Sequence, residues 1–304
     1  MNRLDNKTRV LITKLLVEGN SVRATARIAD VSKNTVTKLL VALGEVCSEY
    51  QDKALRNLPC QQIEVDEIWS FCYSKQKNVP VSMKGQFGVG DVWTWTAIDA
   101  ETKLVPSWLV GDRDGYTAGA FIKDLASRLA SRVQLTSDGL KLYVQAVEDA
   151  FGCDIDFAQL IKQYGGEGSN RNPETRYSPA VCTGVEKIAV TGRPDEALVS
   201  TSYVERQNLT MRMSMRRFTR LTNAFSKKVQ NHAAAIALHF FHYNFCRIHS
   251  SLRVTPAMAA KVTDRLWEVS DLVAMLVARE DAEEAEKGPR RTRNKPKTNE
   301  GAEG

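Results

Sequence analysis

The sequence predicts an α/β protein in which a mixed five-stranded sheet with flanking helices follows a small all-α domain. Three features of the chain support this fold class. Apolar residues recur at helical spacing over the first 45 residues. From residue 60 to residue 160, the pattern changes in the order of three strands, a helix, a strand, a helix and a strand. A basic, helix-forming run then covers residues 201–228.

The N-terminal segment divides into three helices. A first helix around Leu11 and Leu15 ends at Gly19, and a second fits residues 22–29. A tight turn leads to a third helix, for which Ser32 is the expected N-cap. This arrangement is typical of a helix-turn-helix, although bundles of three helices that do not bind DNA look the same. The front of the third helix would present four residues to the major groove: Lys33, Asn34, Thr35 and Lys38.

The middle of the chain contains the predicted strands and their covering helices. The first strand lies within residues 60–74, and a hairpin follows with strands at Val92 to Asp99 and Lys103 to Val110. The remaining elements are a helix at 115–130, a strand at 133–139, a helix at 140–151 and a strand at 154–160.

These elements predict a division of the chain. We expect a helix-turn-helix domain, a linker, an α/β domain with a Gly/Pro/Asn-rich insertion, a C-terminal helix and a disordered charged tail. Their boundaries are 1–45, 46–59, 60–262 with the insertion at about 163–200, 263–280 and 281–304. The insertion itself contains a predicted hairpin near Val181 to Val190.

Two carboxylates occupy notable positions in the predicted sheet. Asp66 lies in the middle of an apolar strand, where a carboxylate is costly unless it is paired or bound to a metal. Asp138 lies at the C-terminal end of another strand, where sites in α/β sheets are built. Either could instead be ordinary: Asp66 as an edge-strand acid that reaches solvent, and Asp138 as the first residue of an Asp-Gly turn.

The basic run contains a third carboxylate. On a helix, one polar stripe would hold Glu205, Asn208, Arg212, Arg216 and Thr219. Between residues 205 and 253 there are nine Lys or Arg and one acid, a net of +8 that exceeds the +6 of the whole chain. Such a concentrated charge is an electrostatic footprint for nucleic acid. The alternative is a solvated face on which Glu205 pairs with an arginine.

Three converging carboxylates repel one another unless divalent cations lie between them. Two Mg²⁺ ions about 3.5–4 Å apart activate the attacking oxygen and stabilise the leaving oxygen in phosphodiester displacement. The sequence therefore indicates metal-dependent phosphoryl chemistry on a nucleic acid.

The motifs together resemble a known family. "VDEIWSF", "TSDGLKLY", "VERQNLTMRMSMRRFTRLTNAFSK" and "HYNFCRIHSSLRVTPAMAA" are similar to segments of DDE transposases of bacterial insertion sequences, of the insertion-sequence-one type. The resemblance covers roughly residues 60–260. It implies a ribonuclease H-like, retroviral-integrase-like core and often an N-terminal helix-turn-helix. The sequence departs from the family in two ways. It has no cysteine zinc finger, and the spacing from Asp138 to Glu205 is long. The long spacing leaves Glu186 and Glu196 as less favoured candidates for the third carboxylate.

The resemblance implies a site and an activity. Asp66, Asp138 and Glu205 match the metal-binding triad, which would hold two Mg²⁺ (or Mn²⁺) ions. We expect cleavage of element ends to free a 3′-hydroxyl, and transfer of that hydroxyl into target DNA by a homo-oligomer. On the basic run, the residues expected to contact double-stranded DNA are Arg206, Asn208, Arg212, Arg216 and Arg220. Two alternatives remain: a transposase-derived regulator without catalysis, and a nuclease without strand transfer.

Other sequence features predict where in the cell the protein is found. The start of the chain has no apolar signal-peptide region, and the longest nearly apolar run, residues 232–241, is too short to span a membrane. The six cysteines form no C-x-x-C pair, which indicates reduced thiols. We therefore expect a bacterial cytoplasmic, nucleoid-associated protein. The four histidines between residues 232 and 249 are interpreted as packing or DNA-facing residues, with a zinc site as the alternative.

Overall fold

The N-terminal part of the structure is helical. The computed structural model describes residues 3–165, 181–219 and 224–286. Three helices begin the chain: α1 (Asn6–Val17), α2 (Val22–Ile28) and α3 (Lys33–Ala54). In each, the residue before the helix accepts a hydrogen bond from a backbone N–H of the first turn, which satisfies a donor that a helix start leaves unpaired. The predicted N-cap at Ser32 is confirmed.

Six strands form one mixed sheet in the order β3-β2-β1-β4-β5-β6. The pairs β1–β2, β2–β3 and β5–β6 are antiparallel, whereas β1–β4 and β4–β5 are parallel. The first five strands thus have the ribonuclease H-like order that the resemblance implies. The bounds are β1 (Gln62–Cys72), β2 (Gly90–Asp99), β3 (Trp108–Gly111), β4 (Gln134–Ser137), β5 (Asp156–Gly165) and β6 (Val181–Thr191).

The strand count and one boundary differ from the prediction. β6 falls in the segment interpreted as an insertion with its own hairpin, but it pairs with β5 and extends the sheet to six strands. It lies at the sheet edge, and most of its described side chains are exposed, so no alternating pattern marks it. β3 begins at Trp108, not at Lys103, because Lys103 adopts a positive φ of 60° and Pro106 has no N–H to donate.

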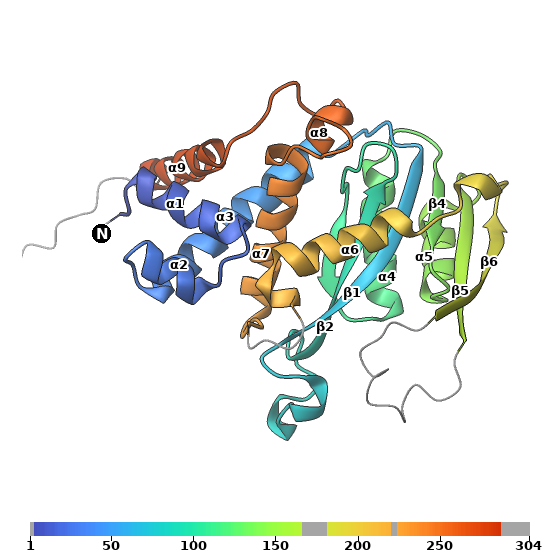
Figure 1. Ribbon diagram of the computed structural model, residues 1–304, viewed down its shortest axis with the longest axis horizontal. Helices are drawn as coiled ribbons and strands as arrows, with labels where there is room; N and C mark the ends of the chain where they lie inside the picture. Colours follow the sequence, from blue (N-terminus) through green and yellow to red (C-terminus); the bar gives the residue numbers. More distant parts are fainter. Residues whose placement is uncertain (1–2, 166–180, 220–223, 287–304) are drawn as a thin grey trace, which may run out of the picture.

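Helices cover both faces of the sheet (Figure 1). On one face, α4 (Gly115–Arg128) and α5 (Leu142–Phe151) share a hydrophobic core with Val65 of β1. On the other, α6 (Ser202–Ser214) and α7 (Val229–Phe241) share a core with Ile68. Successive residues of a strand point to opposite faces. Even-numbered positions of β1 therefore face α6, and odd-numbered positions face α4 and α5.

The basic run does not form the single helix predicted from the sequence. α6 ends at Ser214, a 3₁₀ turn follows at Arg216–Phe218, and α7 begins only at Val229. Met215 between the first two is extended and buried, and Phe218 is buried beside it in the core over Ile68. Burying both side chains requires the chain to turn, so Arg216 leaves the α6 stripe; Arg220 lies outside the described residues.

The C-terminal segment returns to the N-terminal helices. A π-helical turn (His242–Cys246) and α8 (Pro256–Ala259) lead to α9 (Val269–Glu286). The predicted helix at 263–280 is therefore present but starts later and extends to Glu286, so residues 281–286, which were predicted to belong to the disordered tail, are helical. Residues 287–304 of that tail lie outside the described residues. α9 is bound to the first helix, where Arg9 Nη1 lies 2.8 Å from Glu280 Oε2. The other 3₁₀ turns are Gln76–Asn78, Val81–Met83 and Glu196–Leu198. In the described part of the chain, none of the helices has the length and apolarity to cross a membrane.

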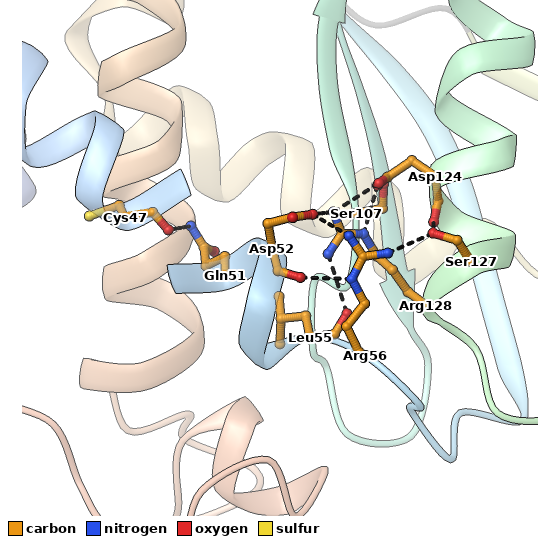
Figure 2. A network of polar contacts seen from close by, with 9 residues as sticks. All are labelled: Cys47, Gln51, Asp52, Leu55, Arg56, Ser107, Asp124, Ser127 and Arg128. Carbon is orange, nitrogen blue, oxygen red and sulfur yellow. Dashed lines mark hydrogen bonds and ion pairs between the residues drawn. The ribbon is translucent and has the colours of Figure 1, made fainter. Parts of the chain in front are cut away.

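α3 joins the N-terminal helices to the sheet. It continues through residues 46–54, which the sequence assigned to a linker. At its end, Arg128 of α4 donates to Asp52 Oδ1 at 2.9 Å and to Asp124 Oδ2 at 2.7 Å, and Arg56 donates to Ser127 Oγ at 2.8 Å (Figure 2). These charge-assisted contacts fix the C-terminal end of α3 to α4.

The middle of α3 crosses α7 at close range. A methyl group added at Gly44 would lie 2.5 Å from both Cα and Cβ of Ala234, which are atoms that cannot rotate away. The two helices therefore pack backbone to backbone, and only glycine fits at this position.

We predict that Gly44→Ala destabilises the protein. Helix propensity alone would favour alanine by up to ~1 kcal/mol, but overpacking costs roughly 1–3 kcal/mol and should prevail. Urea unfolding measures the difference. The matched control is Gly119→Ala in α4, where an added methyl meets nothing within 4 Å and should stabilise. A Gly44→Ala variant as stable as Gly119→Ala would contradict the close crossing.

Candidate active site

Two strands bring the carboxylates together. β1 and β4 are parallel, with Val65 opposite Ser137, the last residue of β4. β1 continues past this point, whereas the chain leaves the sheet after β4. Asp66 and Glu67 of β1 therefore lie beside Asp138, the first residue after β4. One carboxylate oxygen from each of these three residues lies within 4.8 Å of the others. Among the described residues, this is the group of His, Cys, Asp or Glu side chains that could hold a metal ion.

Asp66 is held from the α6 side. Asn208 Nδ2 donates to Asp66 Oδ2 at 2.8 Å, and the backbone N–H of Glu67 donates to Asp66 Oδ1 at 2.8 Å. Asn208 was predicted to contact DNA, but the structure buries it at the carboxylate cluster. Its Oδ1 is buried without a hydrogen-bond partner among the described residues. An oxygen donor thus remains available next to the three carboxylates.

Glu67 is held from the opposite face. Arg113 forms an ion pair with Glu67 Oε1 at 2.6 Å, and the Tyr143 hydroxyl donates to Oε2 at 3.2 Å. The sequence interpretation did not include Glu67 in the site. Apolar residues alternate on the odd-numbered positions of β1, so position 67 carried the signal of the core face. Its only sequence signal was its place directly after Asp66.

Glu205 lies on α6 but outside the cluster. Its carboxylate accepts a hydrogen bond from Thr201 Oγ1 at 2.7 Å and forms an ion pair with Lys162 of β5. It is three residues before Asn208, which contacts Asp66 directly. The structure thus brings Asp66 and Asp138 together and places Glu205 on the adjoining helix, where it is paired with a cation.

A buried glutamate fixes the start of α6. Glu64 Oε2 accepts the backbone N–H groups of Tyr203 and Val204 at 2.8 and 2.9 Å. Burial raises the pKa of Glu64, and these two hydrogen bonds oppose the rise. Because Glu64 and Asp66 lie on the same face of β1, one strand sets the position of both the helix start and Asn208.

The carboxylate cluster is electrostatically unfavourable without a cation. Burial, with the negative charges of Glu67 and Asp138, raises the pKa of Asp66 to about 7. Burial and Asp138 also raise the pKa of Glu67, against the opposing effect of Arg113. A divalent cation would relieve this repulsion, and carboxylate and amide oxygens are the ligands that Mg²⁺ and Mn²⁺ prefer. The donor set therefore fits such an ion.

The predicted DNA-contacting residues fall on different surfaces. Lys33, Asn34 and Lys38 are exposed on α3, and Thr35 is half-buried with its N–H capped by Ser32. On the basic run, Arg206 and Arg216 are exposed and Arg212 is half-buried.

Two of the four histidines, His232 and His239, are packed in the core. His232 lies between two serines, with Nε2 3.1 Å from Ser70 Oγ and Nδ1 3.2 Å from Ser226 Oγ. Burial lowers the pKa of both His232 and His239 to about 3, so both are neutral. Neither lies in a metal-binding group of the described residues. All six cysteines are free thiols.

Comparisons with known proteins add structural neighbours. No family model and no curated protein matches the chain. It is similar to a piggyBac transposase synaptic complex with hairpin DNA, at 9% identity and a TM-score of 0.44, over 98% of this chain and 79% of that one. It is also similar to a Mos1 mariner paired end complex with Mn (12%, 0.20, 49% and 57%) and to a Mos1 strand transfer complex (11%, 0.23, 78% and 78%). These TM-scores are low and carry no argument about function.

We predict that Asp66→Asn stabilises the metal-free protein at high pH. With a pKa of about 7 in the folded state against 3.8 ordinarily, folded Asp66 holds its proton where the unfolded chain has lost it. The wild type therefore loses stability as the pH rises from 4 to 7. Asparagine avoids this loss, so the variant should be more stable by roughly 1–3 kcal/mol at pH 8 and nearly equal to wild type at pH 4.

Urea unfolding in EDTA at both pH values measures this effect. The exposed Asp264→Asn variant is the control and should show no gain. A gain at pH 8 no larger than that of the control would mean that the charge on Asp66 is not opposed by its neighbours.

Proposed function

We propose that this chain is a DDE-type DNA transposase that cleaves the ends of an insertion element and transfers the freed 3′-hydroxyl into target DNA. The observation that carries the proposal is the convergence of Asp66 and Asp138 from adjacent parallel strands. The ribonuclease H-like strand order and the sequence motifs around both residues support it.

Asp66 and Asp138 would hold the divalent ions in this proposal. Bound ions would activate the attacking oxygen and stabilise the leaving oxygen at phosphorus. Asn208 fixes one oxygen of Asp66, and Arg113 with Tyr143 fixes Glu67 at the back of the cluster. Cleavage and strand transfer would share this site, since both are displacements of the same bond type.

Glu205 is the proposed third carboxylate. It projects from α6 one turn before Asn208, and its charge is matched by Lys162. For Glu205 to bind an ion, its carboxylate must leave Lys162, which would free that ammonium for a DNA phosphate. Glu67 already lies in the cluster and is the competing assignment for the third ligand.

The proposed DNA contacts come from two parts of the chain. Arg206, Arg212 and Arg216 would bind phosphates near the scissile bond, since they lie on or just after α6. The exposed front of α3 would read the element end in the major groove, in the manner of a helix-turn-helix. Two ends must be joined, so we propose that the active form contains at least two copies of the chain.

We predict that three carboxylate variants abolish cleavage without weakening DNA binding. The substrate is a supercoiled plasmid that carries the sequences flanking this gene, with Mg²⁺ or Mn²⁺. Asp66→Asn, Asp138→Asn and Glu205→Gln should each lower cleavage at least about 100-fold, beyond the 10–100-fold typical of residues that only support a ligand. Binding in EDTA should be unchanged.

Glu67→Gln is the discriminating control. A 10–100-fold loss of cleavage in Glu67→Gln is expected if Glu67 only supports the metal ligands. Near-wild-type cleavage by Glu205→Gln, together with a complete loss in Glu67→Gln, would assign the third ligand to Glu67. DNA binding by the wild type with no metal-dependent cleavage would favour the regulator, and cleavage without joining would favour the nuclease.

A further inference from the structure

A surface groove lies between α3 and the start of α7. It has a volume of about 550 Å³, and its walls come from segments nearly two hundred residues apart in sequence. The α3 wall includes Asn34, Thr37 and Lys38, and the α7 wall includes Lys227, Lys228 and Asn231. The Gly44–Ala234 crossing sets the spacing of the two walls.

The groove is positively charged. Lys38, Lys227 and Lys228 are all exposed, and within the described residues none of them is in an ion pair. The acid in the lining is Glu45, and Arg279 of α9 lies 3.4 Å from it. Arg279 also lies 3.0 Å from both Glu49 and Glu283, so it offsets only part of the Glu45 charge. Three ammonium groups therefore face a groove that is lined by one carboxylate. Such an arrangement attracts an anion that extends along both walls.

The residues that line the groove indicate which anion it binds. Asn34 and Lys38 belong both to the groove and to the α3 front that is proposed to enter the major groove of DNA. Phosphates flank the major groove on either side, so a duplex on α3 would carry a strand of phosphates past the start of α7. The side-chain amide of Asn231 adds a neutral donor, and such groups commonly contact phosphate oxygens.

We propose that this groove binds the phosphodiester backbone of the duplex that α3 reads, with Lys227 and Lys228 as the phosphate contacts. The inference rests on the proposed function in one respect, that α3 is the DNA-reading helix. It adds a second contact surface, at the start of α7, where the sequence indicated a basic run but named neither Lys227 nor Lys228 as a DNA contact. Since α7 packs on the sheet that holds Asp66, the bound duplex would have a fixed position relative to the carboxylates.

The test is the salt dependence of binding by the full chain. Fluorescence anisotropy with a labelled 30-base-pair duplex, in EDTA, gives log affinity against log salt. Each lost phosphate contact lowers the slope by about 0.9. The Lys227→Ala/Lys228→Ala variant should therefore lose about 1.8 from the slope. Between about 50 and 200 mM salt, its affinity should fall about 12-fold less than that of the wild type. The effect should be the same on flanking and random sequences.

The matched control removes the same charge elsewhere. Lys53→Ala/Lys123→Ala replaces two exposed lysines on the last turn of α3 and on α4, and its slope should stay at the wild-type value. An unchanged slope in the Lys227/Lys228 variant would overturn the inference, as would an equal loss in the control, which would be an effect of net charge alone.

The experiments distinguish a groove that does not bind DNA from a protein that is not a transposase. Binding is measured without metal, whereas the transposase proposal depends on cleavage by the carboxylates. Wild-type binding by the groove variant, with cleavage lost in Asp66→Asn, would reject the groove and keep the transposase. Thermal unfolding of both lysine variants should match the wild type, since exposed lysines contribute little to packing.

Discussion

The candidate site depends on one constraint, which is the parallel pairing of β1 with β4. This pairing ends at Ser137, the last residue of β4. β1 continues beyond that end, so Asp66 and Glu67 meet Asp138 where no further strand separates them. The resulting repulsion raises the pKa of Asp66, and the fold carries that cost because the surrounding sheet and helices are well packed. A site that is strained without its ion is suited to bind one.

A second constraint is the packing of α3 across α7. Close contact at Gly44 and the Asp52–Arg128 contacts hold α3 along its length. The helix that is proposed to read DNA therefore belongs to the same packed unit as the sheet. In this account, packing sets the distance between the reading surface and the carboxylates, and no linker length is involved. The segment at 46–54, which resembled a linker in the sequence, is the part of α3 that provides this connection.

Structure that depends on neighbouring residues could be predicted from the sequence, whereas contacts between residues far apart in the sequence could not. The three N-terminal helices and the first five strands follow from caps and periodicity. The meeting of Asp66 with Asp138 was expected from the resemblance of their motifs to a known family, since each residue alone had an ordinary explanation. The β6 segment was predicted to form a separate hairpin, and its mostly exposed side chains gave no sign that it pairs with β5. The role of Glu64 depends on N–H groups about 140 positions away. Likewise, the break in the basic run at Met215 arises from burial against Ile68, which periodicity cannot reveal.

The most direct test of the central claim is a crystal structure of the full chain grown with Mn²⁺, with anomalous scattering used to locate the ions. The account predicts at least one Mn²⁺ bound by oxygens of both Asp66 and Asp138, at roughly the 2.0–2.2 Å typical of small divalent cations. In crystals of Asp138→Asn, that peak should weaken or vanish. An ordered wild-type cluster with no Mn²⁺ at saturating concentration, or Mn²⁺ bound only elsewhere, would contradict the claim that these carboxylates form a metal site.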